Sequence, residues 1–256
     1  MKLRPITKTH GGKHYLADWI IEHFPSRYEE LTYVEPFIGG GSVFLRKKPA
    51  KEEFISDIDW GLMSIYQYLQ QKPADFIDRL KELDYHESVF ESFKAFIATT
   101  ERDKEVKEYV IRRMSRGGLQ KNFAWSDRLR GGKPGDVNGW ETAIAQLPNI
   151  YDRIKSARIE SWSYVEVVEI LAGRSDALWY MDPPYLHETR TATATYTYEM
   201  CLNDHIDFLA ICKGISGKVV ISGYMSKLYK EELNDWACYM REVPNHSGQG
   251  AEKQRR

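Results

Sequence analysis

Apolar residues follow two different spacings along this chain of 256 residues. In KHYLADWIIEHFP (13–25) they recur every three or four positions, which predicts an amphipathic helix that ends at its proline. LTYVEPF (31–37) and EFISDID (53–59) are short runs rich in aromatic and β-branched residues, which predict strands. A glycine turn with helical character separates these two strands, and helical spacing returns in WGLMSIYQYLQ (60–70). This order predicts a parallel, doubly wound sheet.

The pattern becomes helical and highly charged from about 72 to 110, without a strand signal, so we expect this segment to lie outside the sheet. The segment 112–140 is rich in glycine and arginine, which predicts long loops or a ribbon. Strand patterns return at 157–162, 177–182, 218–222 and 237–243, and helical stretches around 163–172, 203–215 and 226–236 separate them. The fold class predicted is therefore α/β, a doubly wound and mostly parallel sheet with an inserted helical and loop segment.

The composition fits a globular protein that buries a core, because 42% of the residues are hydrophobic and 29% are charged. The 36 Lys and Arg nearly balance the 37 Asp and Glu, so a net charge of −1 indicates no particular partner. Three cysteines without close spacing argue against a disulfide framework or a zinc site and fit a reducing compartment. There is no run of about 18 apolar residues. We therefore expect a soluble, cytoplasmic protein that requires neither a membrane nor a metal.

Three glycines at 39–41 follow the first predicted strand and precede SVFL, which has helical apolar character. A glycine turn between strand and helix allows positive φ and lets a ligand approach the backbone amides. Asp57 lies 16 residues beyond Gly41, close to where dinucleotide-binding sheets place the acid that binds ribose hydroxyls. These features predict an adenosine-containing cofactor. Two alternatives stay open: the glycines serve chain packing only, or a helix begins at one of the acids of SDIDWGL, so that Asp57 or Asp59 is its cap.

ALWYMDPPYLHETR (177–190) places an apolar run directly before an acid, two prolines and a tyrosine. The prolines fix φ at about −65° and remove two backbone donors, so carbonyls and the Asp182 carboxylate present acceptors at the end of a strand. Tyr185 adds an aromatic face. Two acceptors and a ring suit a flat ligand that carries an amino group, such as adenine or cytosine. The alternative is a rigid turn without a function.

An exocyclic amine needs such acceptors for chemistry as well as for binding. Its lone pair is delocalised into the base, so the amine is a poor nucleophile. Acceptors that take its hydrogens favour a tetrahedral nitrogen and stabilise the positive charge that develops there in the transition state. A base within duplex DNA must first be flipped out of the helix, at a cost of a few kcal/mol.

Taken together, EPFIGGGSVFL (35–45), SDID (56–59) and DPPY (182–185), with GGK (11–13) near the amino end, resemble the Dam-like class of S-adenosylmethionine-dependent DNA N6-adenine methyltransferases. That family has a Rossmann-like methyltransferase fold and inserts a target-recognition domain between its first motifs and its Asp-Pro-Pro-Tyr. The resemblance implies S-adenosyl-L-methionine as the cofactor and double-stranded DNA as the partner.

The resemblance also implies a domain organisation, and it spans the catalytic core much more than the insert. The cofactor-binding half of the core would be 1–71, the target-recognition domain 72–150, and the Asp-Pro-Pro-Tyr half 151–256. Further matches to the family lie at 196–205, which resembles the segment after the catalytic loop, and at 219–229, which resembles a later strand.

The same resemblance implies a role for each position of the motifs. The cofactor contacts would be Thr9, His10, Gly12, Lys13, Glu35, Phe37, Gly39, Gly41, Asp57 and Asp182. The catalytic residues would be Asp182, Pro183, Pro184 and Tyr185. Asp182 would bind the target amine, Pro183 would offer its carbonyl, and Tyr185 would stack on the base.

The chain departs from the family pattern at two places. Thr9 stands where many relatives carry an aromatic residue, so we expect the adenine of the cofactor to be held differently. The sequence stops at GQGAEKQRR without the last hydrophobic strand of many relatives, so we expect that edge of the sheet to be absent or supplied otherwise.

The candidates for DNA binding come from the distribution of charge. The segment 112–133 contains seven basic residues against one acid, Asp127, a net charge of +6 in a chain whose total is −1. Basic side chains neutralise DNA phosphates, while aromatic and amide groups stack on bases or bind their edges. The candidates are Arg112, Arg113, Arg116, Lys121, Asn122, Trp125, Arg128 and Arg130, together with Arg190 in the loop after the catalytic tyrosine. The alternative is a solvated loop.

The sequence thus predicts methyl transfer from S-adenosylmethionine to N6 of adenine in a specific short sequence of double-stranded DNA, with base flipping and no covalent enzyme intermediate. The nearest alternative acceptors are cytosine N4 and an adenine in RNA. A nucleic-acid-binding relative with impaired catalysis is a second alternative, whereas a nucleotide-dependent oxidoreductase lacks a recognisable hydride acceptor site. We expect a monomer, and the sequence leaves open whether a cognate restriction endonuclease accompanies it or whether it acts as a phage or bacterial orphan methylase.

Overall fold

A computed structural model of the protein describes residues 2–9, 12–186 and 198–242. The chain divides into two compact units, Met1–Tyr224 and Met225–Arg256. The first unit contains the sheet, and the described part of the second contains the short helix α9 (Lys227–Glu232). Among the described residues, no helix combines the length and the hydrophobicity that a membrane crossing requires.

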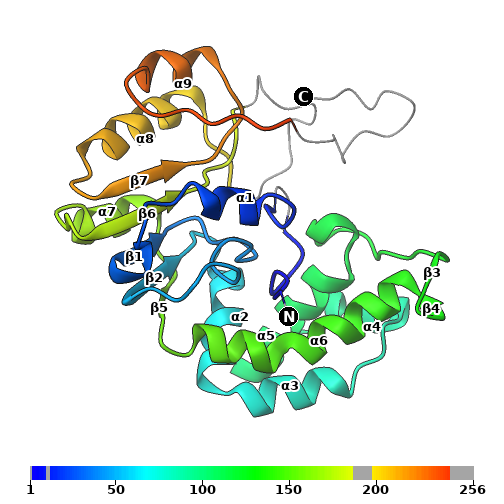
Figure 1. Cartoon of the computed structure of the whole chain (residues 1–256). Helices are drawn as coiled ribbons and strands as arrows, with labels where there is room; N and C mark the ends of the chain where they lie inside the picture. Colours follow the sequence, from blue (N-terminus) through cyan, green and yellow to red (C-terminus); the bar gives the residue numbers. More distant parts are fainter. Residues whose placement is uncertain (1, 10–11, 187–197, 243–256) are drawn as a thin grey trace. The chain divides into compact units, whose positions relative to one another are not determined.

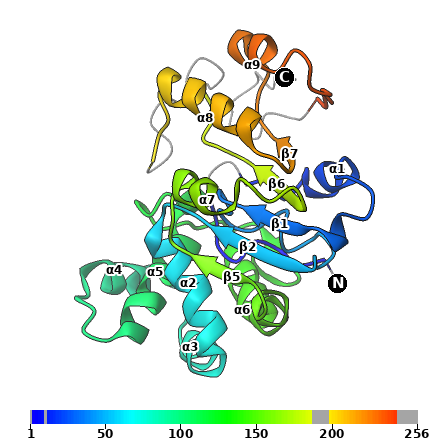
Figure 2. The same ribbon diagram turned by 90° about the vertical axis from the view of Figure 1, so that its left-hand side faces the viewer.

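A five-stranded sheet forms the centre of the first unit (Figures 1 and 2). Its strands are β1 (Thr32–Glu35), β2 (Glu52–Ser56), β5 (Arg158–Glu160), β6 (Ala177–Met181) and β7 (Lys218–Ile221). They lie in the order β5-β2-β1-β6-β7, and every pairing is parallel. The chain therefore winds outward from β1 through β2 to β5 and then returns to the other side of β1. The predicted doubly wound parallel sheet is confirmed, and its switch point lies between β1 and β6.

Paired residues of β1 and β6 show which side chains point to each face of the sheet. Tyr33 lies opposite Leu178, and both belong to the large apolar cluster that also contains residues of α1 and α2. Val34 lies opposite Trp179, and because side chains alternate along a strand, this pair points to the other face. Figure 2 shows α1 on one side of the sheet and α7 and α8 on the other. The helices are α1 (Ala17–Glu22), α2 (Trp60–Gln71), α7 (Tyr164–Leu171) and α8 (Leu202–Gly214).

The segment between α2 and β5 is a helical insert. It contains α3 (Pro73–Lys81), α4 (Glu87–Ala95), α5 (Glu101–Met114), the antiparallel hairpin of β3 (Leu129–Arg130) and β4 (Lys133–Pro134), and α6 (Gly135–Ile154). Here α5 packs on α2 and α3 packs on α6 (Figure 1). Phe76, Tyr109 and Trp140 join the same apolar cluster as the sheet. α6 is continuous through residue 150, where the sequence predicts a domain boundary. The boundaries of the insert stay predictions.

Two predicted element boundaries differ from the structure inside the first unit. The segment after the glycine turn forms hydrogen-bonded turns rather than a helix, with i to i+4 bonds only at Leu45 and Lys47. Too few residues separate Gly41 from Pro49 for a stable helix. The predicted loop at 112–140 is shorter than expected, because α5 extends to Met114 and α6 begins at Gly135.

The strand predicted at 237–243 is wrong for the described residues 237–242, which have no strand structure. A strand requires a paired neighbour and a buried face. Tyr239 and Met240 are instead exposed, at 61% and 79%. Alternation of apolar and polar residues was therefore not sufficient to predict pairing in the second unit.

Candidate active site

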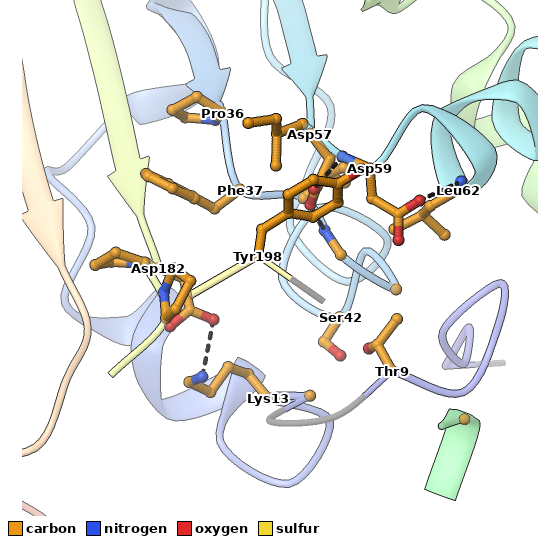
Figure 3. Close-up of a pocket in the computed structure, with 18 of the residues that line it drawn as sticks. Thr9, Lys13, Pro36, Phe37, Ser42, Asp57, Asp59, Leu62, Asp182 and Tyr198 are labelled. Atoms are coloured by element: carbon orange, nitrogen blue, oxygen red, sulfur yellow. Dashed lines mark hydrogen bonds and ion pairs between the residues drawn. The ribbon is translucent and has the colours of Figure 1, made fainter. Parts of the chain in front are cut away.

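A cavity of about 460 Å³ opens at the carboxyl ends of β1, β2 and β6 (Figure 3). Open α/β sheets bind ligands at this position, and sites for small molecules have volumes of about 300–1,000 Å³. The cofactor residues predicted from the sequence that line it are Thr9, Gly12, Lys13, Glu35, Phe37, Gly39, Asp57 and Asp182. Gly41 is buried behind the turn and does not line the cavity, and His10 lies outside the described residues.

The glycine turn after β1 has a conformation that only glycine adopts easily. Gly39 and Gly41 have φ angles of 49° and 76°. A side chain at Gly41 would place its Cβ 2.7 Å from the hydroxyl of Tyr66, which itself donates to the Gly39 carbonyl at 3.1 Å. Packing therefore explains why a glycine stands at position 41. Gly39 lines the cavity, and its backbone N–H donates to the carboxylate of Asp57.

Asp57 follows β2 and lines the same cavity. Its two carboxylate oxygens accept hydrogen bonds from the backbone N–H of Gly39 at 2.9 Å and of Asp59 at 3.1 Å. The cap of α2 is Asp59, whose Oδ1 accepts from the Leu62 N–H at 3.1 Å, so Asp57 does not cap that helix. Desolvation by the surrounding protein raises the pKa of Asp57 to about 6, although the two backbone donors oppose the shift.

Glu35 is the last residue of β1, and only 2% of it is exposed. The Tyr33 hydroxyl donates a hydrogen bond to its Oε2 at 2.6 Å. Burial raises the pKa of Glu35 to about 8, against the opposing effects of the Tyr33 hydrogen bond and the Lys47 ammonium. A carboxyl group in this state is mostly protonated at neutral pH and ionises when a cation binds beside it.

Asp182 directly follows β6, all of whose residues are buried. The Lys13 ammonium lies 2.8 Å from its Oδ2 (Figure 3). The Ser222 hydroxyl, at the end of β7, donates to its Oδ1 at 2.6 Å. Tyr180 Oη lies 3.0 Å from that hydroxyl, and Tyr185 Oη donates to the same Oδ1 at 3.3 Å. Three side chains thus fix the orientation of this carboxylate and leave it beside the cavity.

The residues after Asp182 divide between the cavity and its surroundings. Pro183 and Pro184 line the cavity. The Tyr185 ring meets Tyr224 edge to face, with centroids 4.9 Å apart, and the Lys13 ammonium lies 4.5 Å from the Tyr185 centroid. Lys13 therefore contacts both the carboxylate and the ring of the predicted catalytic motif.

Aromatic residues form another part of the cavity wall. The Phe37 ring stacks on Tyr164, the first residue of α7, with centroids 5.3 Å apart and an angle of 27° between the planes. Phe208 of α8 meets Phe37 edge to face at 6.0 Å. Both Phe37 and Tyr164 line the cavity, so a flat apolar surface lies beside the acids. Such a surface suits an aromatic ring of a ligand.

The predicted DNA-binding residues occupy different environments. Arg116, Lys121, Asn122, Trp125 and Arg128 are exposed on the segment between α5 and the hairpin. Arg113 is half-buried and donates to the Gly139 carbonyl at 3.2 Å. Arg112 is buried and paired with Asp59, a place that differs from the exposed position expected of a phosphate contact. The backbone of Arg130 lies in β3, and Arg190 lies outside the described residues.

Comparison with known proteins decides between the alternatives that this geometry leaves. The sequence profile of the D12 class N6 adenine-specific DNA methyltransferases matches residues 10–244, which is most of the chain. The chain belongs to this family. Its description names adenine N6 and DNA, so the predicted acceptor and substrate are confirmed, and cytosine N4 and RNA are set aside.

This D12 class methyltransferase is similar to three curated relatives over most of its length. It is 24% identical to the type II methyltransferase M1.LlaDCHI of Lactococcus lactis, over 97% of the chain and 90% of the relative. It is 26% identical to the type II methyltransferase M.MjaIII of Methanocaldococcus jannaschii, over 80% and 78%. It is 25% identical to the DNA adenine methylase of Escherichia coli K12, over 90% and 84%.

The sequence did not assign Ser222, Asp59, Arg112 or the cavity-lining Tyr164 to this methyltransferase site. Ser222 was recognised only as part of a strand, although a polar residue at the end of a strand next to β6 was a usable signal. Asp59 was considered only as a helix cap. Arg112 was assigned to DNA because of its charge, and no local signal indicated that α5 would bring it to the cavity wall.

Proposed function

We propose that this D12 class methyltransferase uses S-adenosylmethionine as its methyl donor, and that Asp182 binds the amine of an adenine flipped out of double-stranded DNA. The observation that carries the proposal is the position of Asp182. Its carboxylate is fixed by Lys13 and Ser222 at the edge of a cavity that also contains Asp57. The acceptor and the proposed cofactor site are therefore adjacent.

The residues of the cavity fit this cofactor. Asp57 offers carboxylate lone pairs to ribose hydroxyls, because each of its oxygens accepts only one backbone hydrogen bond. Glu35 would ionise beside a cationic group, and Phe37 with Tyr164 would contact the adenine ring. Bound here, S-adenosylmethionine would supply an electrophilic methyl group on a sulfonium.

The protein contributes positioning and charge to the reaction. Asp182 and the Pro183 carbonyl would accept the two hydrogens of the adenine amine, which frees the nitrogen lone pair and stabilises the developing positive charge. Lys13 and Ser222 hold the carboxylate so that little reorganisation is needed when that charge appears. Pro184, rigid and without an N–H donor, directs Tyr185 toward the place where the base would stack.

The insert supports the DNA side of the proposal. Arg116, Lys121 and Arg128 are exposed on a segment whose residues 118–121 also line the cavity. Basic side chains next to the active cavity would neutralise phosphates that flank the flipped base. We therefore infer that the insert, predicted at 72–150, recognises DNA, and that the protein acts as a monomer in the cytoplasm, where its substrate is present. Sedimentation of the protein alone and with a short duplex tests the monomer.

Transfer of tritium from labelled S-adenosylmethionine to duplex DNA, followed by digestion to nucleosides, tests the function. We expect the label in N6-methyldeoxyadenosine. Asp182→Asn should lower the rate on the order of 10²- to 10³-fold, because it removes the preorganised negative charge and replaces one acceptor oxygen with an NH₂ donor. Asp207→Asn, which changes an exposed acid on α8, is the matched control and should keep the wild-type rate. Absence of transfer by the wild type, or full activity of Asp182→Asn, would refute the proposal.

A further inference from the structure

Arg112 belongs to the insert but forms part of the wall of the cofactor cavity. Only 6% of the residue is exposed. Its Nη1 and Nη2 atoms donate to the two carboxylate oxygens of Asp59 at 3.0 and 2.8 Å. Its Nε donates to Glu108 Oε2 at 3.3 Å. All three nitrogens of the guanidinium therefore bind carboxylates, in the two-pronged geometry that a lysine cannot reproduce.

Asp59 connects this guanidinium to the acid that would bind ribose. Its side chain caps α2 by accepting from the Leu62 N–H, and its own backbone N–H donates to Asp57 Oδ1 at 3.1 Å (Figure 3). The other oxygen of Asp57 accepts from Gly39. Arg112 thus holds the carboxylate of Asp59, and the backbone of Asp59 holds the carboxylate of Asp57.

A purely structural role explains this arrangement less well. Apolar contacts already join α5 to α2, through residues such as Tyr109 and Ile65 of the common cluster. Burying an ion pair costs desolvation that its attraction seldom recovers fully, so such pairs are weak stabilisers. The contact is nevertheless tight, since a Cβ at Gly61 would lie 2.8 Å from Glu108 Oε2 and 3.2 Å from Arg112 Nη2. The pair lies where it can orient a ligand-binding group.

We propose that Arg112 is a positioning residue for the cofactor, acting through Asp59 to orient the Asp57 carboxylate toward the ribose hydroxyls. This inference rests on the proposed use of S-adenosylmethionine. It assigns Arg112 to the cofactor side of the site, in place of the DNA contact predicted from its charge.

Electrostatics support the same role. The Arg112 charge lowers the pKa of Asp57, while the Asp59 charge raises it, and the result of these effects with burial is a pKa of about 6. Loss of Arg112 should therefore raise the pKa of Asp57, and loss of the Asp59 charge should lower it. Beside Arg112 and Asp59, the titratable groups around this carboxyl are Tyr66 on α2 and a set that lines the same cavity. The members of that set are Lys8, Lys13, Glu35, Lys121, Tyr164, Tyr180, Asp182, Tyr198 and Glu199.

The test measures the dissociation constant of S-adenosylmethionine by calorimetry between pH 5 and 7 without DNA. Glu35, whose pKa is about 8 in the free protein, contributes to the pH dependence in every variant alike, so each pH midpoint is compared with that of the wild type. The variants are Arg112→Met, Arg112→Lys and Asp59→Asn. The matched control is Arg102→Met, because Arg102 lies on the same helix and pairs with Asp75 at 3.2 Å on the exposed surface. Asp57→Ala gives the affinity expected without the ribose hydrogen bonds.

At pH 7 Arg112→Met should weaken binding about tenfold, the usual loss for a hydrogen bond to a charged group. Arg112→Lys should lie between this variant and the wild type, and Arg102→Met should bind normally. The pH at which affinity falls should move upward in Arg112→Met and downward in Asp59→Asn. In the methylation assay KM for the cofactor should rise with little change in kcat.

The outcomes separate the two proposals. If the wild type does not bind S-adenosylmethionine at any pH, the proposed function fails. If the wild type binds and Asp57→Ala does not, but Arg112→Met has the affinity and pH midpoint of the wild type, only the role of Arg112 is refuted. Should Arg112→Met fail to fold, Arg112→Lys and Asp59→Asn decide, because an unchanged pH midpoint in both contradicts the proposal.

Discussion

Glu35 is a buried acid whose carboxylate form is disfavoured in the free protein. Because burial raises its pKa from 4.5 to about 8, the folded state loses stability as pH rises through that interval. Glu35→Gln should abolish the loss. At pH 8.5 the variant should have a free energy of unfolding higher by on the order of 2–4 kcal/mol. At pH 4, where the wild-type residue is mostly neutral in both states, the difference should be small.

Urea unfolding at both pH values measures this effect. Glu91→Gln, at an exposed acid on α4, is the control and should show little difference at either pH. The same Glu35→Gln variant should bind S-adenosylmethionine more weakly at pH 8.5, since it cannot ionise beside a cation. If Glu35 serves function at the expense of stability, Glu35→Gln should both stabilise the fold and weaken the binding of S-adenosylmethionine. Equal stability of variant and wild type at pH 8.5 would contradict the raised pKa of the buried Glu35 carboxyl.

Ser222 provides a second prediction at the residue scale. Its hydroxyl donates to Asp182 Oδ1 at 2.6 Å and lies 3.0 Å from the Tyr180 hydroxyl, so it orients the carboxylate proposed as catalytic without lining the cavity. Ser222→Ala should lower kcat for methylation about tenfold, equivalent to about 1.4 kcal/mol. The affinity for S-adenosylmethionine should change little.

The measurement is single-turnover methylation together with calorimetry. Ser92→Ala is the matched control, because the Ser92 hydroxyl donates only to a carbonyl of its own exposed helix at 2.8 Å. An Asp182-positioning role is contradicted if Ser222→Ala keeps the wild-type rate, or if it loses cofactor affinity and rate together.

Motif residues of the site could be identified from the sequence because each stands next to a strand end. Asp57 follows one strand and Asp182 another, and parallel strands bring their carboxyl ends to one edge. Ser222 and Arg112 could not be identified in this way. Their partners are separated from them by 40 and 53 positions, so their roles depend on strand order and on how α5 packs.

At the scale of elements, we predict that replacing a glycine by alanine has opposite effects on stability in the turn after β1 and in helix α6. Gly41 has a φ of 76°, and a Cβ there would lie 2.7 Å from Tyr66 Oη. Gly41→Ala should therefore lower the free energy of unfolding by about 2–4 kcal/mol, through left-handed strain and overpacking. Gly139 lies inside α6 with open space around its Cβ position. Gly139→Ala should instead raise stability by about 0.5–1 kcal/mol.

Equilibrium unfolding of the two variants in parallel checks the contrast. Both changes add one methyl group, so composition and denatured-state effects are matched between them. A similar destabilisation by Gly41→Ala and Gly139→Ala would show that the turn does not require glycine.

Element types were easier to predict than element boundaries. The strands of the sheet and α2 follow strong apolar patterns and were found close to their observed bounds. The segment 112–140 was predicted as loop because arginine and glycine dominate it, yet Met114 continues the buried face of α5 begun by Val106 and Val110. Tertiary burial, rather than local composition, decides where that helix ends.

At the scale of the whole first unit, two ion pairs with buried guanidinium groups link the insert to β2 and to the residue that caps α2. Arg112 of α5 binds Asp59 beyond the end of β2, and Arg153 of α6 binds Glu53 within β2. Lys47 also contacts Glu53, so this acid is shared by two cations. The attachments lie near opposite ends of one strand. We infer that the segment proposed to bind DNA is held at a fixed position relative to the proposed cofactor cavity, as in-line transfer would require.

The charge distribution of the molecule yields a last prediction, about salt. The net charge of −1 opposes general attraction to DNA, so we expect binding to rest on the local excess of cations between α5 and the hairpin. Arg116 and Arg128 are exposed there and do not line the cofactor cavity. Changing both to Gln should weaken duplex binding and reduce the slope of log K against log salt by about 1.8, or roughly 0.9 for each phosphate that is no longer neutralised.

Fluorescence anisotropy of a labelled duplex at several salt concentrations measures that slope. The matched control changes Lys81 and Lys155 to Gln, two exposed lysines in i,i+3 ion pairs outside the segment, and so alters the net charge equally. If binding followed net charge alone, the two double variants would lose the same affinity and the same slope. If the local segment binds the phosphates, only Arg116→Gln with Arg128→Gln reduces the slope, while the affinity of both proteins for S-adenosylmethionine stays that of the wild type.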